Sequence, residues 1–194
     1  MKKLLFVGCL AALLMGCTFE PVDPAKESPD AGYKLQSNET TIVGTNLIKT
    51  HNEAYGYDTI EHVETKMNST KNITSSLNMD FGVAPAIQDG VYYFRAFLRS
   101  DKVFMFKRLC FLDPSTETRI FLTLNNTVPD VSSNFDFIET GFFNITEEQR
   151  LQLIEMFKKD CKVFAEGNSL STKPAVVPKK YRNAFVELLS YEVK

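Results

Sequence analysis

The sequence has no tryptophan and only two histidines, and none of its four cysteines forms a Cys-x-x-Cys pair. It also contains no Gly-x-Ser-x-Gly, no glycine-rich phosphate loop and no His-Glu-x-x-His. These absences exclude the motifs of a serine nucleophile elbow, of a P-loop nucleotide site and of a common zinc protease. Beyond its first residues the chain lacks any apolar run of about 18 residues, so no later segment is expected to span a bilayer.

The N-terminal segment combines Lys2 and Lys3, an apolar run over residues 4–15, and Gly16 before Cys17. A basic start, an apolar core and a small residue before the cleavage point are typical of a secretory signal. The ending Leu-Met-Gly-Cys resembles the lipobox of bacterial lipoproteins. The resemblance implies cleavage before Cys17, diacylation of its thiol and acylation of its new amine. The alternative is an ordinary signal peptide in which Gly-Cys occurs by chance.

This reading divides the chain into a signal peptide (1–16), a lipidated tether (17–40) and a single domain (41–194). The tether is rich in proline and acidic residues and is expected to be disordered. In the sorting pattern of enterobacterial lipoproteins, aspartate after the lipidated cysteine causes retention in the inner membrane. Thr18 stands there instead, so the resemblance implies a lipid anchor in the outer membrane, with the domain in the periplasm or at the cell surface.

The charge balance gives no alternative means of attachment. The formal net charge of −2 becomes −4 once cleavage removes Lys2 and Lys3, the only charged residues of the signal. An acidic surface argues against nucleic acid as a partner and against electrostatic docking to anionic lipid. We therefore expect the acyl chains on Cys17 to hold the protein to the membrane.

The domain is predicted to be α+β, a mostly antiparallel sheet with one or two C-terminal helices packed on it. Aromatic and β-branched runs divided by polar turns predict consecutive antiparallel strands over residues 91–99, 103–112, 119–124 and 135–143. In the first run, Arg95 and Arg99 share a face that points to solvent or to a partner, so they are candidates for partner contact. The opposite face contributes to an aromatic stripe formed by Tyr92, Phe94, Phe104 and Phe106. This stripe is expected to form the core, with a groove for a hydrophobic ligand as the alternative.

Thr146 and Gln149 form the capping-box pattern of a helix N-terminus. Helical spacing then predicts a buried stripe of Leu151, Ile154, Phe157 and Cys161. A second short helix is predicted after Pro178, with a strand over residues 185–193 as the alternative.

Cys110 and Cys161 remain after the signal is removed and Cys17 is acylated. A pair of cysteines in an exported protein indicates one disulfide, which here would link the helix to a central strand. Two buried free thiols are the alternative.

The most specific local hypothesis is a metal site on a hairpin. If Gly56 and Tyr57 form a two-residue turn, His51 faces His62, with Glu53 and Glu64 beside them. Imidazole and carboxylate groups suit zinc, copper or nickel, so these four residues are candidate ligands of a weak divalent-metal or pH-responsive site. The alternative is an exposed polar hairpin face.

We expect a non-enzymatic envelope module that binds or positions another envelope protein or surface component, and we expect no cofactor. A small tethered domain without a catalytic motif is typical of such a role. One alternative is an envelope hydrolase, metal-dependent through His51 and His62. Another is a surface-exposed lipoprotein that guards the cell against phage or host factors.

Overall fold

Antiparallel strands and two helices form the domain, which confirms the predicted α+β class. The computed structural model describes residues 39–65, 74–76, 79–131 and 137–193, all within a unit that runs from Ser37 to Lys194. The signal peptide, Cys17 and residues 18–38 of the predicted tether lie outside the described residues. The last predicted tether residues, Glu39 and Thr40, belong to the first strand.

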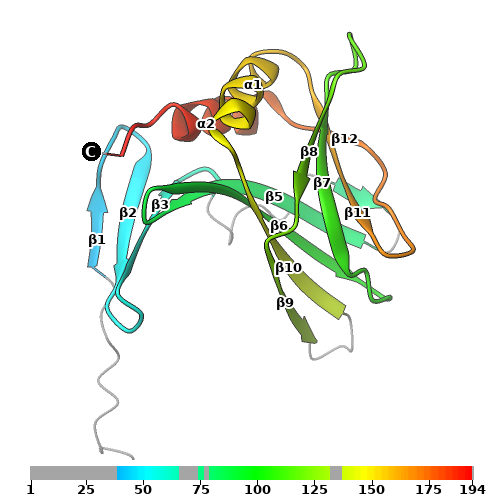
Figure 1. The fold of residues 1–194 in the computed structure, drawn as a ribbon, viewed down its shortest axis with the longest axis horizontal. Helices are drawn as coiled ribbons and strands as arrows, with labels where there is room; N and C mark the ends of the chain where they lie inside the picture. Colours follow the sequence, from blue (N-terminus) through cyan, green and yellow to red (C-terminus); the bar gives the residue numbers. More distant parts are fainter. Residues whose placement is uncertain (1–38, 66–73, 77–78, 132–136, 194) are drawn as a thin grey trace, which may run out of the picture. The chain divides into compact units, whose positions relative to one another are not determined.

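The larger of two sheets contains eight strands in the described part of the chain. In spatial order they are β1 (Glu39–Ile42), β2 (Leu47–Asn52), β3 (Tyr57–His62), β5 (Met79–Gln88), β6 (Val91–Ser100), β10 (Phe137–Asn144) and β9 (Asn126–Val131), with β4 (Thr74–Ser76) also paired to β5. In Figure 1 the sheet is bent, with β1–β3 on one side of β5 and β6 and β9–β10 on the other.

The smaller sheet has the order β12 (Ala175–Val176), β11 (Lys162–Gly167), β7 (Phe106–Leu112) and β8 (Arg119–Thr123). Of the runs predicted to be consecutive strands, β7 and β8 do pair. The prediction is wrong for β6 and β7 and for β8 and β10, because the members of each of these pairs belong to different sheets. The chain leaves β6 at Ser100, and Met105 takes a positive φ of 56° just before β7 begins. Glu139 of β10 accepts hydrogen bonds from the N–H groups of Met105 and Phe106, which fixes this crossing.

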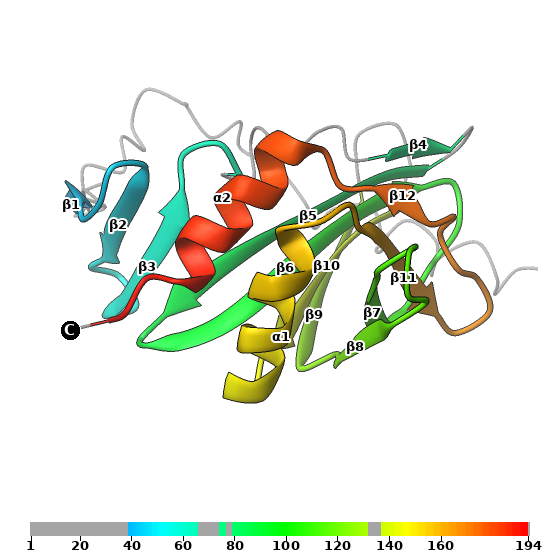
Figure 2. The same cartoon turned by 90° about the horizontal axis from the view of Figure 1, so that it is seen from above.

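Two helices cover one face of the larger sheet (Figure 2). Helix α1 (Glu147–Phe157) begins at the predicted capping box, in which the Thr146 side chain accepts from the Gln149 N–H and the Gln149 side chain accepts from the Thr146 N–H. Its predicted buried stripe is partly wrong, because Leu151 is 53% exposed and the helix ends before Cys161. Helix α2 (Lys179–Leu189) follows Pro178 as predicted, which excludes the alternative strand.

The core between the helices and the sheets is centred on four phenylalanine rings. Phe94, Phe111, Phe157 and Phe185 come from β6, β7, α1 and α2, with ring centroids 4.8–6.1 Å apart. All four side chains are almost completely buried. Phe104 and Phe106 are also buried, and Tyr92 packs against the same cluster, so the predicted aromatic stripe is core. This packing makes each ring contact at least one other element.

Candidate functional site

The β2–β3 hairpin does not have the register that the metal hypothesis requires. Its pairing places His51 opposite Asp58 and His62 opposite Leu47. The turn spans four residues ending at Gly56 (φ 66°), because Tyr57 already pairs with Asn52. Asp58 and His62 are therefore four residues apart on β3, so the two imidazoles are separated by about 13 Å along the strand.

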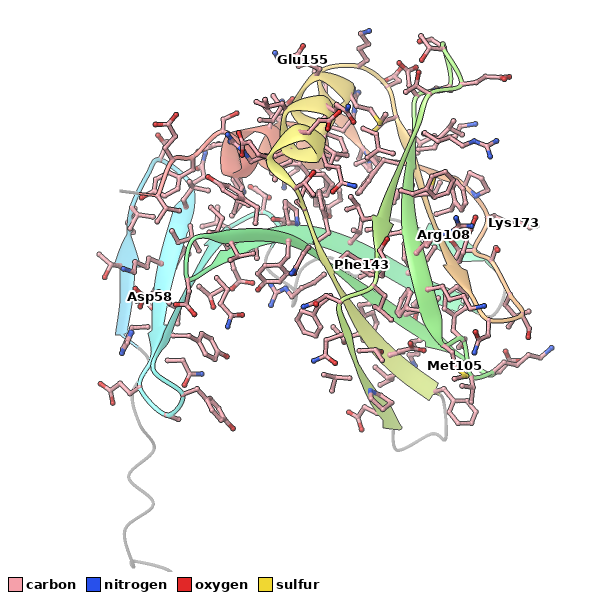
Figure 3. All side chains as sticks on the ribbon, viewed as in Figure 1. Asp58, Met105, Arg108, Phe143, Glu155 and Lys173 are labelled. Atoms are coloured by element: carbon pink, nitrogen blue, oxygen red, sulfur yellow. The ribbon has the colours of Figure 1, made fainter. Side chains whose placement is uncertain are left out.

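His51 belongs to an exposed ion-pair cluster near the turn. Its Nδ1 lies 2.7 Å from Asp58 Oδ1, and Lys49 Nζ lies 2.6 Å from Asp58 Oδ2. Hydrogen bonds from Lys49 and then His51 lower the pKa of Asp58. Asp58 lies on the hairpin (Figure 3), and Glu53 lies in the exposed turn beside it.

His62 instead ties the hairpin to helix α2. Its Nδ1 accepts a hydrogen bond from the Glu64 N–H at 3.1 Å, so Nε2 carries the proton and donates to Glu187 Oε2 at 3.2 Å. Asn46 Nδ2 donates to the same carboxylate at 3.1 Å, and the Glu64 carboxylate pairs with Lys180. Both nitrogens of the buried imidazole are thus in use.

The four predicted ligands consequently do not converge, and the metal hypothesis is wrong for this geometry. Within the described residues, no three histidine, cysteine or acidic side chains are grouped so that they could hold a metal ion. The sequence could not reveal this, because the register depends on whether the turn has two residues or four.

The two arginines lie on the predicted face of β6, away from the core. Arg95, however, pairs with Glu61 of β3, and its side chain is only 16% exposed. Burial lowers the pKa of its guanidinium to about 10. Arg99 also has an interaction partner within the chain. Arg95 therefore links β6 to β3 and forms part of the sheet face.

Cys110 and Cys161 are both buried and both free, so the predicted disulfide is not formed in the structure. Cys110 pairs with Phe164 across β7 and β11, whereas Cys161 packs in the main core with Val163 and Ala165. Because side chains alternate along a strand, the two thiols lie on opposite faces of the small sheet. Burial raises the pKa of Cys110 to about 11 and that of Cys161 to about 12, so both thiols stay protonated at neutral pH.

A groove of about 480 Å³ lies on the larger sheet, on the face opposite the core. Its lining residues are Tyr57, Gln88, Asp89, Val91, Tyr93, Asn125, Asn126, Val128, Phe142 and Asn144. They come from β3, the end of β5, the β5–β6 turn, β6, the segment just before β9, β9 and β10. The register between neighbouring strands brings these residues together. Tyr93 of β6 pairs with Asn144 of β10, and Phe142 of β10 pairs with Asn126 of β9. Since alternate residues share a face, these four side chains point into the groove together.

Comparison with protein-family models, curated proteins and solved structures finds no match.

Aromatic rings form one part of the chemistry of the groove. Tyr93 and Phe142 contact each other with centroids 6.0 Å apart, and Tyr57 is stacked on the exposed Tyr55 at 6.2 Å. Burial raises the pKa of Tyr93 to about 12, so its hydroxyl is neutral at physiological pH. The groove thus presents ring surface without phenolate charge.

Uncharged polar groups form the other part. In the described part of the chain, the side-chain amides of Gln88, Asn125 and Asn144 and the hydroxyl of Tyr93 have no hydrogen-bonding partner. Asp89 is the only carboxylate among the lining residues that the structure describes, and its Oδ1 accepts a hydrogen bond from the Asp58 N–H at 3.1 Å. The groove therefore offers mainly neutral donors and acceptors to a ligand.

Sequence reasoning missed this groove, although one signal pointed to it. Asp89 and Gly90 both have positive φ, 48° and 81°, and form the two-residue turn between β5 and β6. Asp-Gly between strands is a strong sign of such a hairpin. It would have placed β5 beside β6 and shown where the rim of the sheet lies.

Proposed function

We propose that this chain is a lipid-anchored bacterial envelope protein whose domain binds another envelope component through the groove on the larger sheet. The lipobox resemblance at Cys17 supports the anchor and placement in the outer membrane, with the domain in the periplasm or at the cell surface. Within the described residues, neither helix has the length and apolar character needed to cross a bilayer. Acyl chains on Cys17 would provide the attachment.

The groove itself is the observation that carries the binding role. Ligand sites are typically concave and aromatic, with a few polar groups that fix orientation, and this groove has both features at about 480 Å³. The alternative of a hydrolase receives less support. The described lining offers a single carboxylate, Asp89, whereas acid-base hydrolysis needs a second titratable group placed across the substrate.

Anchoring is tested by replacing the acylated residue. Labelled palmitate should enter the wild-type chain and not Cys17→Ser, and the variant should leave the membrane fraction. Wild-type protein without label, or a variant that still fractionates with membranes, would contradict the anchor.

Binding through the groove is tested by photo-crosslinking in intact cells. A photoreactive residue at Val128, 52% exposed in the groove, is compared with one at Leu151, 53% exposed on α1. We expect an envelope component to be captured from position 128 and not from position 151. Equal capture from both positions, or none from position 128, would contradict a binding role for the groove.

A further inference from the structure

We propose that the ligand of the groove is a neutral saccharide. This inference rests on the proposed function and names the ligand class of the same site. Its starting point is a groove that combines aromatic ring surface with several uncharged donors and acceptors and has no cation among its described lining residues.

The rings provide the first half of the match. A pyranose has faces covered by C–H groups, which pack on the negative face of an aromatic ring through dispersion and weak C–H contacts. Tyr57 and Phe142 supply such ring surfaces on β3 and β10, and Tyr93 of β6, only 6% exposed, packs beside Phe142 and supports it. Each comes from a paired strand, so the platform is rigid before a ligand arrives.

The polar groups provide the second half. Sugar hydroxyls both donate and accept, and so do the side-chain amides of Gln88, Asn125 and Asn144. None of these three amides is occupied by a partner within the described residues. Asn144 pairs with Tyr93 across β10 and β6, and all three amides line the groove together with the rings, so they are available to the hydroxyl groups of a sugar that stacks there.

Charge separates this ligand class from the others. The described lining contains no lysine, arginine or histidine, so a phosphate, sulfate or carboxylate group would find no countercharge. Asp89 would repel such a group. A long aliphatic ligand would leave the amides desolvated and unpaired, which costs binding free energy. A neutral ligand rich in hydroxyl groups satisfies both constraints.

The probe is a printed panel of neutral gluco-, manno- and N-acetylglucosamine oligosaccharides together with sulfated counterparts. Hits are confirmed in solution with the mature protein in detergent. Because the chain has no tryptophan, its emission comes from seven tyrosines, of which Tyr57 and Tyr93 line the groove, so binding can be followed by tyrosine fluorescence. We expect binding of neutral members and weaker binding of each sulfated counterpart.

Substitutions in the groove test whether the sugar binds there. Asn144→Ala should weaken binding about three- to tenfold, as expected for one hydrogen bond. Tyr57→Ala should weaken it about tenfold through loss of the ring, whereas Tyr57→Phe should stay within about twofold of wild type. Gln152→Ala removes an exposed amide from α1 and should change nothing. Circular dichroism of each variant establishes that it is folded.

Several results would overturn the inference. Equal or tighter binding of sulfated sugars would show that charge, not neutral hydroxyl groups, is recognised. Binding that survives both Tyr57→Ala and Asn144→Ala would place the sugar elsewhere. If no panel member binds at concentrations up to about 1 mM while position 128 still crosslinks an envelope component, the saccharide is wrong and the proposed function stands.

Discussion

Glu139 offers a sharp test of how the two sheets are joined. Its carboxylate is buried, with the residue 8% exposed, and accepts hydrogen bonds from the N–H groups of Met105 and Phe106, both at 2.7 Å. The Thr127 hydroxyl donates to it at 3.0 Å. The Glu139 side chain of β10 thereby joins β10 both to β9 and to the start of β7.

Glu139→Ala should destabilise the domain by about 3 kcal/mol. The Phe106 N–H would be left unpaired in a buried position, which costs about 1–3 kcal/mol, and the bond from Thr127 contributes about 1 kcal/mol more. The Met105 residue is 53% exposed, so water can partly replace the carboxylate at its N–H. Glu139→Gln keeps one acceptor oxygen and should cost less than the alanine variant.

The assay is urea denaturation of the unacylated mature chain, followed by far-ultraviolet circular dichroism. Glu155→Ala is the matched control, because that carboxylate is 70% exposed on α1 and pairs with Lys158 three residues on (Figure 3). It should change the free energy of unfolding by less than about 0.5 kcal/mol. A Glu139→Ala variant that unfolds as the control does would refute the role given to this carboxylate.

Three further predictions concern other parts of the domain. Cys110 and Cys161 should resist a thiol reagent at pH 8, since burial keeps their pKa values near 11 and 12, and both should react after denaturation. If the mass of the protein without reductant is two hydrogens lower than expected, the two cysteines form a disulfide instead. Gly167→Ala should destabilise the fold by about 2 kcal/mol in the same urea assay, because a Cβ there collides with the backbone oxygen of Phe104, and a neutral effect would contradict this packing. Partial burial raises the pKa of Glu187, but hydrogen bonds lower it by more, so the net shift of its pKa is downward. The Glu187 carboxylate therefore stabilises the fold at pH values above its unfolded pKa, near 4.5. This stabilisation is lost as the pH falls through the lower pKa of the folded state. Glu187→Gln should therefore reduce acid destabilisation, and an unchanged pH profile of unfolding would count against it.

Features set by local sequence could be predicted correctly. The alternation over residues 91–99 gave both β6 and the separation of its two faces, because side chains alternate on any strand. The capping box at Thr146 predicted the start of α1. It could do so because its two hydrogen bonds join residues only three positions apart in the sequence. Pro178 likewise marked the start of α2.

Strand β5 was not predicted because its sequence lacks the alternation of polar and apolar residues that marks a half-buried strand. Phe81, Val83 and Ile87 face the core, while small residues on the other face are also buried, so the alternation of polar and apolar residues disappears. Pro85 argues further against a central strand. In the described residues β5 pairs with β4 at one end and β3 at the other, and Pro85 lies between these stretches, where its missing N–H costs no ladder bond.

The end of α1 was misjudged because helical and strand periods overlap there. Cys161 lies four residues after Phe157, which fits a helical stripe, but it also lies two before Val163, which fits a strand. The structure ends the helix at Phe157 and begins β11 at Lys162. The predicted disulfide assumed that the helix extends to Cys161 and places it against the strand that carries Cys110. Because the helix ends earlier, that reason for the disulfide no longer applies.

The groove could not be derived from the sequence because it depends on registers between distant strands. Tyr93 and Asn144 are neighbours only because β6 and β10 pair in one particular alignment. A slip of one residue along β10 would turn Phe143, now buried in the core, toward the groove and would bury Asn144 instead. The burial of Phe143 therefore selects the alignment that exposes the amide and ring chemistry. Core packing on one face of the sheet determines which groups the other face can offer to a ligand.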